Sequence, residues 1–456
     1  MPQMKIQSLL AMFLLAVLPC AAQSTDIPAL SGHINHMTSS QDLRINGKRI
    51  QISAETRIYL AKPPVFLRRS SPVKLSFSQF RPYIGQYVDV FGELTTPQYG
   101  LEATRIILRA RVPQQVSGSG VIDALPPVLL PTPSGTDHFI RAAGYLISIS
   151  DSTRSTFEKP LASSADIATN TWVRFKGLQR TDGIVIASEV FFSHNIPAPQ
   201  RDAQNPGANV GPTTAASGKR QNQLTQSPTE IGPGQMSSSP EAIMQERISR
   251  IGAKLVPQYQ TSLPASDQSR IDFRFKVLSE NNASAQSRDA TLQPDGNILI
   301  SQALVDRLQN DSQIAAVLAR SMACALDKLP ANGRSRKARV AAENAVTAAG
   351  YVIPVLAVAG SITTSVENAY MTAYENQSER VGLWLMRDAG YDIEQAPMAW
   401  WLLAQKPGQS LDQVTLPPRT EYLYTFLGDS WPREYAAASK SSVASSTPTS
   451  APAAQQ

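Results

Sequence analysis

The chain has 456 residues and a formal net charge of +6 that is spread along its length. This length allows two to four domains. Charged residues make up 17% of the chain, and no block of lysine and arginine is interleaved with aromatic residues. A nucleic acid is therefore not expected as a partner.

The first residues have the pattern of a secretory signal peptide, 1–22. Lys5 supplies the positive end, residues 9–18 form an apolar segment too short to span a membrane, and small residues follow. We predict cleavage after Ala22 and a periplasmic or extracellular location. Lipidation of Cys20 is the less favoured alternative. After cleavage Cys324 is the only cysteine, so an intrachain disulfide is impossible.

Segments 23–112 and 113–195 form an internal repeat of about 83 to 96 residues, too long for a solenoid. Each copy has short runs of alternating apolar and polar residues with glycine at the breaks, which predicts two small antiparallel β domains. The pairs that carry the repeat are Gly32-His33-Ile34 with Gly120-Val121-Ile122, residues 49–53 with 145–149, 88–92 with 173–177, and 100–108 with 183–191.

The order of these motifs resembles a secreted bacterial β-domain family of unknown function with OB-like barrels. In other settings OB barrels bind oligonucleotides or sugars. The repeats lack an evident aromatic platform, so a spacer or protein-docking role is favoured over a ligand-binding one. Residues 196–240 are rich in Pro, Gln and Ser and predict a disordered linker. Residues 433–456 predict a disordered tail.

Residues 241–432 predict a final α+β domain that is mainly helical. Ser238 and Ser239 are candidate caps for its opening helix, and Pro240 suits the first turn. The remaining expected elements are strands at 271–278 and 297–301, helices at 312–329 and from Glu375 to about 389, and a packed helix with Trp400, Trp401 and Leu403.

Arg320-Ser321-Met322-Ala323-Cys324 stands in an apolar helical frame where a zinc protease carries H-E-x-x-H. A second block, from Tyr374-Glu375-Asn376 to Ala389-Gly390-Tyr391-Asp392, follows downstream. Together the blocks resemble the metallopeptidase family of HtpX and the CAAX prenyl protease, family forty-eight, over about residues 241–432. The resemblance implies a zincin-like fold, Glu375 at the third zinc-ligand position, and a peptide-binding strand edge with Ala290, Leu292 and Pro294.

The chemistry of that site is not expected to survive. The four histidines, His33, His36, His138 and His194, all precede residue 241. Arg320, Ser321 and Cys324 replace the two ligands and the base, so neither bound zinc nor catalysis is expected. We hypothesise that Arg320 replaces the charge of the metal and pairs with Glu375. The alternative is that Arg320 points to solvent.

The nearly apolar segment 345–362 predicts a buried or groove-lining helical hairpin, and membrane contact is the alternative. The favoured function is that of a pseudopeptidase that binds peptide or protein, or acts as a chaperone, in the cell envelope. Two alternatives remain: an active zinc metalloendopeptidase with an atypical site, and a surface ligand-binding protein that acts through its β-repeats.

Overall fold

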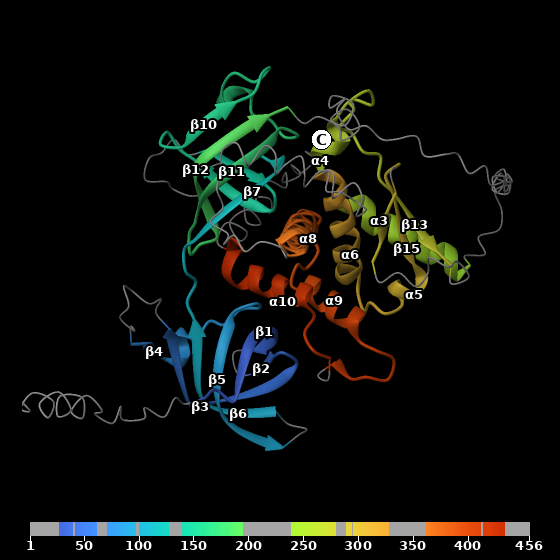
Figure 1. The fold of residues 1–456 in the computed structure, drawn as a ribbon. Helices are drawn as coiled ribbons and strands as arrows, with labels where there is room; N and C mark the ends of the chain where they lie inside the picture. Colours follow the sequence, from blue (N-terminus) through green and yellow to red (C-terminus); the bar gives the residue numbers. More distant parts are fainter. Residues whose placement is uncertain are drawn as a thin grey trace, which may run out of the picture. The chain divides into compact units, whose positions relative to one another are not determined.

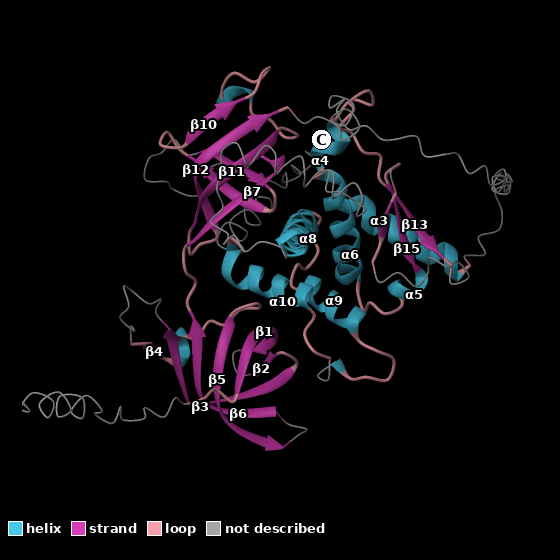
Figure 2. Ribbon diagram, viewed as in Figure 1, coloured by secondary structure: helices cyan, strands magenta, loops and turns pink. Residues whose placement is uncertain are grey.

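The computed structural model describes residues 27–39, 42–61, 71–96, 100–126, 138–194, 239–279, 289–293, 295–327, 362–411 and 414–433. The chain divides into two compact units, Met1–Ala110 and Arg111–Gln456. Strands dominate the first part of the chain and the main helices follow residue 239 (Figure 1, Figure 2). The predicted order of β repeats followed by a mainly helical region is confirmed.

Several predicted segments lie outside the described residues. They are the signal peptide 1–22, the linker 196–240 except its last two residues, the tail 433–456 except Arg433, and the apolar segment 345–362 except Ile362. Among the described helices, none is long and apolar enough to cross a membrane.

The first unit is a barrel-like sheet with the order β2-β1-β5-β6-β3-β4, and a β2–β3 pairing closes it. The Asn46-Gly47 turn joins β2 to β3, and both residues have positive φ, as a tight hairpin turn requires. The strands are β1 (Leu30–Ser39), β2 (Asp42–Ile45), β3 (Lys48–Ala61), β4 (Val73–Leu75), β5 (Tyr87–Thr96) and β6 (Gly100–Arg109), and a 3-10 turn spans Phe77–Gln79.

A second barrel-like sheet opens the second unit. Its order is β10-β12-β11-β7-β8-β9, and a β12–β9 pairing closes it. The strands are β7 (Gln114–Ala124), β8 (His138–Ala142), β9 (Tyr145–Ile149), β10 (Arg154–Phe157), β11 (Trp172–Gln179) and β12 (Ile184–Ser193), with a 3-10 turn at Ser164–Asp166.

The four sequence pairs of the repeat fall on equivalent strands: β1 with β7, β3 with β9, β5 with β11 and β6 with β12. Two registers differ from the prediction, each by one residue. The core residues Ile50 and Ile52 correspond to Ile147 and Ile149 rather than to Leu146 and Ser148. Leu108 pairs with Val88, and its equivalent is Phe192, which pairs with Val173, rather than Phe191. The glycines that start β6 and precede β12 match, but one more residue lies between the glycine and the bulge in the second copy.

The sequence predicted antiparallel repeats, but each barrel also contains at least one parallel strand pair. β3 pairs with β6 in parallel, and β9 and β10 each pair with β12 in parallel. The reason is geometric. Five strands that close into a ring cannot alternate in direction all the way round, so at least one neighbouring pair must be parallel.

The remaining chain forms a three-stranded sheet and seven α-helices among the described residues. Ser239 caps the first helix by accepting from the Ala242 N–H, and Pro240 occupies its first turn, as predicted. The elements are α3 (Pro240–Leu255), α4 (Gln258–Ser262), β13 (Arg274–Leu278), β14 (Thr291–Leu292), β15 (Asn297–Ser301), α5 (Gln302–Val305), α6 (Asp311–Leu326), α8 (Ile362–Asp388), α9 (Gln395–Ala404), α10 (Pro418–Thr425) and a π-helical turn (Phe426–Ser430).

The second barrel and the helices share one hydrophobic core, although the sequence predicted separate domains at 113–195 and 241–432. Val121, Leu146 and Ile184 of the barrel belong to the same buried cluster as the apolar faces of α3, α6 and α8. Helix α8 lies between this barrel and α6 (Figure 1). The β8–β9 turn makes the contact: Trp384 donates to the Gly144 carbonyl at 3.0 Å.

Gly144 is required at this turn for two reasons. Its φ is +76°, which disfavours a side chain, and a Cβ at this position would overlap Cβ of Arg380. Gly390, after α8, has a similar φ of +78°, but a Cβ there would meet no other atom within 4 Å. A side chain at Gly144 would therefore meet both backbone strain and steric overlap, whereas one at Gly390 would meet backbone strain alone.

We predict that Gly144→Ala lowers the free energy of unfolding of the second unit by about 3 kcal/mol, because strain and overpacking add. Gly390→Ala carries the strain alone and should cost about 1 kcal/mol. Urea unfolding followed by tryptophan fluorescence measures both. Equal losses would contradict the close packing of the turn on α8.

Candidate functional site

The crossing of α6 and α8 brings the sequence-predicted positions together. Arg320, Ser321 and Cys324 lie on α6, and Glu375 lies on α8. The helices approach closely because Gly382 faces α6 without a side chain: a Cβ there would be 3.2 Å from the Arg320 amide nitrogen. The apolar side chains of α6 are buried. Their burial sets the rotation of the helix about its axis and therefore the direction in which Arg320 extends.

Arg320 binds two carboxylates, and neither is Glu375. Its Nη1 donates to Asp289 Oδ2 at 2.9 Å, and its Nε lies 2.9 Å from Glu379 Oε1 as a close ion pair, although that N–H is not aligned as a hydrogen bond. The hypothesis of an Arg320–Glu375 pair is therefore corrected, and the solvent-facing alternative fails too. Only 12% of the Arg320 side chain is exposed.

The change of partner follows from helix geometry. Glu379 lies four residues after Glu375, about one turn along α8. The turn of α8 that faces Arg320 is the one that holds Glu379 and Gly382. Glu375 is partly exposed, whereas Glu379 is 4% exposed.

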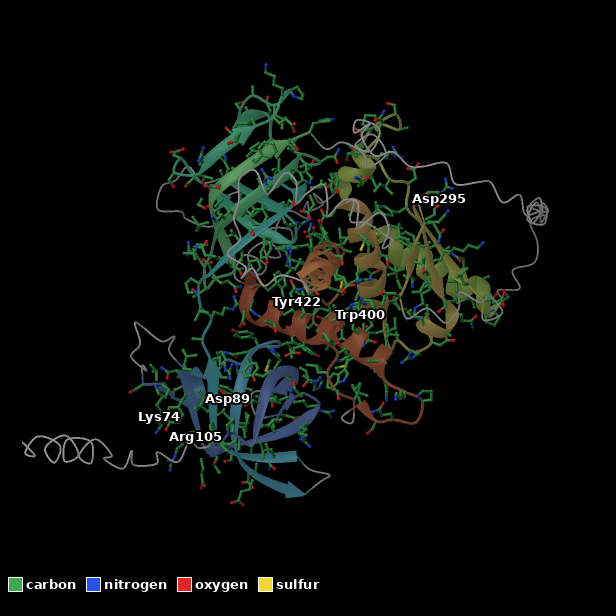
Figure 3. All side chains as sticks on the ribbon, in the orientation of Figure 1. Lys74, Asp89, Arg105, Asp295, Trp400 and Tyr422 are labelled. Carbon is green, nitrogen blue, oxygen red and sulfur yellow. The ribbon has the colours of Figure 1, made fainter. Side chains whose placement is uncertain are left out.

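Arg419 of α10 completes a network of four charges. It lies 3.1 Å from Asp289 Oδ2 and 3.2 Å from Glu379 Oε1. Trp400 of α9 donates its indole N–H to Glu379 Oε2 at 3.2 Å. Its ring also lies 4.2 Å from the Arg419 guanidinium carbon. Figure 3 labels Trp400 among these C-terminal helices.

In this network, burial disfavours the charged form of each group, and ion pairing favours it. Burial raises the pKa of Glu379, and the guanidinium groups of Arg419 and Arg320 oppose that rise. Burial alone would lower the pKa of Arg320, but Glu379 and Asp289 outweigh it and raise the pKa. Arg320 thus remains a fixed cation at the centre of the site.

Ser321, where the sequence resemblance would place the general base, makes structural hydrogen bonds. Its hydroxyl donates to the Ala290 carbonyl at 3.0 Å and lies 3.3 Å from the Val317 carbonyl. Ala290 is buried, and Leu292 lies in the short strand β14. The third predicted groove residue, Pro294, lies outside the described residues. The segment before β14 is thus bound to α6 by Ser321 and Arg320.

The donor set does not fit a zinc ion. Burial raises the pKa of the Cys324 thiol, with Arg320 opposing, so the neutral thiol rather than the ligating thiolate is favoured. The Arg320 cation lies beside it. Among the residues that the structure describes, no group of three histidine, cysteine or acidic side chains is arranged to hold a metal ion.

A second buried polar cluster joins the barrel to the helices. Arg141 of β8 lies 2.5 Å from Asp123 Oδ1 and 2.6 Å from Asp388 Oδ2. Asp327, just after α6, accepts from the Val121 amide at 3.2 Å and from the Gln377 side chain at 2.8 Å. Burial raises the pKa of Asp327 to about 7 and that of Asp123 to about 6.

A cavity of about 640 Å³ lies between α3 and the chain that leads into β13. β13 is an edge strand of the small sheet. The cavity is lined by five apolar residues and six polar or charged ones: Ala253, Val256, Ile271, Phe273 and Phe275, with Ser249, Gln260, Thr261, Arg270, Asp272 and Arg274.

Sequence reasoning missed Asp289, Glu379, Arg419 and this cavity. Glu379 carried a signal, because it is an acidic residue one helical turn from Glu375 within the matched block. Asp289 and Arg419 are distant in the sequence and belong to no motif. No protein-family model matches the chain, and no curated protein matches it either.

We predict that Arg320→Met lowers the free energy of unfolding of the second unit by about 3 kcal/mol or more, because Glu379 loses one of its two cations in the interior. The matched control is Arg180→Met, which removes an ion pair with Asp182 from a side chain that is 54% exposed. That loss should stay under about 1 kcal/mol. Similar losses by urea unfolding would show that the network contributes little.

We also predict a pH effect from Asp327. Its pKa is raised by folding from an ordinary 3.8 to about 7, so the folded state holds the proton more tightly and its stability falls as the pH rises through that window. Asp327→Asn cannot ionise. Relative to the native chain, it should therefore gain up to about 4 kcal/mol between pH 4 and pH 7. A difference in unfolding free energy that is constant with pH would contradict the raised pKa.

Proposed function

We propose that residues 239–433 form a non-catalytic, zincin-like relative of the zinc metallopeptidases that binds extended peptides. The sequence resemblance supports the family. The paired helices α6 and α8, with a small sheet beside α6, agree with such an architecture. The guanidinium of Arg320 supplies positive charge where the resemblance would place zinc, so the active-peptidase alternative is disfavoured.

The preceding barrels are proposed to be OB-like. In each barrel, the five main strands follow the order first-second-third-fifth-fourth around the ring, and the fourth strand pairs with the first. The third and fifth strands are parallel. We further propose that the chain is exported by its signal peptide and acts as a binding or chaperone-like protein in the cell envelope.

One observation carries the peptide-binding proposal. The side-chain amide of Gln245 lies against the outer edge of β13: its Nε2 donates to the Phe275 carbonyl at 2.7 Å, and its Oε1 accepts from the Val277 amide at 2.9 Å. A neighbouring parallel strand would make this same pair of bonds with the N–H and C=O of one of its residues. The edge of β13 therefore has the geometry to accept a main chain.

The cavity begins beside this edge, since Phe275 also lines it. A peptide that adds to β13 would place alternate side chains in the cavity, where Val256, Ile271 and Phe273 favour apolar groups. The edge next to β14, proposed from the sequence, remains a second candidate; its Ala290 carbonyl accepts from Ser321, much as the β13 edge groups bond to Gln245.

The test is to titrate fluorescent extended heptapeptides with alternating apolar residues into the full chain. Ala253→Phe, which fills the cavity, should weaken binding at least tenfold. The control Lys254→Phe changes the next exposed residue of α3, which does not line the cavity, and should leave binding within twofold. Equal effects, or no binding by the native chain, would reject the proposal.

The loss of zinc chemistry is tested separately. Purified protein should contain substoichiometric zinc by elemental analysis and should not cleave casein. Stoichiometric zinc with chelator-sensitive cleavage would establish the active-peptidase alternative, whatever the peptide titration shows.

A further inference from the structure

Two glutamine side chains bind the same stretch of main chain, residues 269–277. Gln245 of α3 bonds to the outer edge of β13, as described above. Gln260 of α4 makes an equivalent pair of bonds: its Nε2 donates to the Ser269 carbonyl at 3.3 Å, and its Oε1 accepts from the Ile271 amide at 2.9 Å. Each amide thus takes the place of one residue of a parallel neighbouring strand.

Between the two amides the main chain keeps one open pair of groups, the Phe273 carbonyl and the Phe275 amide. The Arg274 N–H donates to the Gly296 carbonyl, on the β15 side, at 3.2 Å. In a planar trans peptide the carbonyl of Phe273 points the opposite way, to the outer edge. The Phe275 N–H lies on the outer edge with its own carbonyl, because successive strand residues alternate between the two edges. Neither group of the open pair has a hydrogen-bond partner among the residues that the structure describes.

The cavity lies beside this open pair, and Ser249 adds a donor to it. Phe273 and Phe275 line the cavity together with Ser249 and Ala253, two small residues of α3. The Ser249 hydroxyl accepts from Gln245 Nε2 at 2.9 Å, so its own hydrogen points elsewhere, and no described residue accepts it. A hydroxyl and a main-chain N–H, both donors, therefore border the same space.

The spacing of the two glutamines sets which end of a peptide fits. A parallel peptide residue opposite Arg274 would donate to the Phe273 carbonyl and accept from the Phe275 amide. Toward the C-terminus of the peptide, Gln245 occupies the place two residues further on, so the peptide cannot continue along the edge without displacing it. Toward the N-terminus, the Gln260 amide is four residues away, which leaves room for the chain.

The charges around the cavity nearly balance. The charged residues of its lining are Arg270, Asp272 and Arg274. Arg270 pairs with Asp272 at 3.0 Å, and Asp295 interacts with Arg274 from outside the lining. An anionic group would therefore be recognised here by directed hydrogen bonds rather than by an excess of positive charge.

We propose that this site takes the free C-terminal end of an extended peptide. The inference rests on the proposed peptide binding and names the part of the peptide that is bound. The last residue donates its N–H to the Phe273 carbonyl, and its carboxylate accepts from the Phe275 N–H and the Ser249 hydroxyl, because hydrogen bonds to an ionised acceptor are the stronger ones. The side chain before it lies on the face of Phe273 and Phe275, where an apolar group fits.

The test uses the full chain and a heptapeptide that carries a fluorophore at its N-terminus, a free carboxylate, and apolar residues at positions two, four and six. A Gly-Ser-Gly extension after the last residue should weaken binding at least tenfold, because it removes the carboxylate from its donors and directs the chain against Gln245. The same extension between the fluorophore and the first residue should change binding less than twofold.

Ser249→Ala should weaken binding of the free-carboxylate peptide at least fivefold. It should change binding of the C-terminal amide less than twofold, because the single oxygen of the amide is taken by the Phe275 N–H. The matched control is Ser262→Ala, which removes an exposed hydroxyl of α4 outside the cavity lining and should leave both affinities unchanged.

Equal binding of the two extended peptides, or a greater loss from the N-terminal extension, would overturn this inference and leave peptide binding at the cavity standing. The inference would also fall if Ser249→Ala weakened the acid and the amide equally. Absence of binding by every peptide would instead reject the proposed function together with the inference.

Discussion

The carboxylate of Glu379 lies in the interior of the second unit, where an ionised group is stable only beside positive charge. Arg320 from α6 and Arg419 from α10 both approach its Oε1, and Trp400 from α9 donates to the other oxygen. One side chain of α8 therefore ties three other helices together. A metal ion could meet the same electrostatic demand, but two guanidinium groups meet it with covalently attached charge that neither chelators nor metal supply can remove.

The elements of this region were predictable from the sequence because their signals are local. Capping by Ser239, the apolar stripe of α6 and the β strand at 297–301 all depend on neighbours in the chain. Which carboxylate meets Arg320 depends instead on where two helices cross, and a shift of one turn exchanges Glu375 for Glu379. The contribution of Asp289 and Arg419 depends on contacts over 31 and 130 residues of sequence.

The repeats illustrate the same limit at a larger scale. Matching strands were found from alternation and glycine positions, yet the union of the second barrel with the helices was not. The turn Asn46-Gly47 in one copy corresponds to Ala143-Gly144 in the other. Ala143 is buried and its carbonyl accepts from Arg380. The smaller alanine, in a conformation that favours asparagine, is thus explained by packing against α8 rather than by the turn itself.

Gln245 has a consequence for how the protein behaves in concentrated solution. Edge strands with open main-chain groups recruit one another, and natural proteins block them with charge, proline or covering elements. Here a side-chain amide from α3 occupies the Phe275 and Val277 positions of the edge. A side chain can withdraw by rotating about its own bonds, whereas a covering helix cannot. Gln245 therefore blocks this edge reversibly, and a strand could reach the Phe275 and Val277 groups only by displacing its side-chain amide.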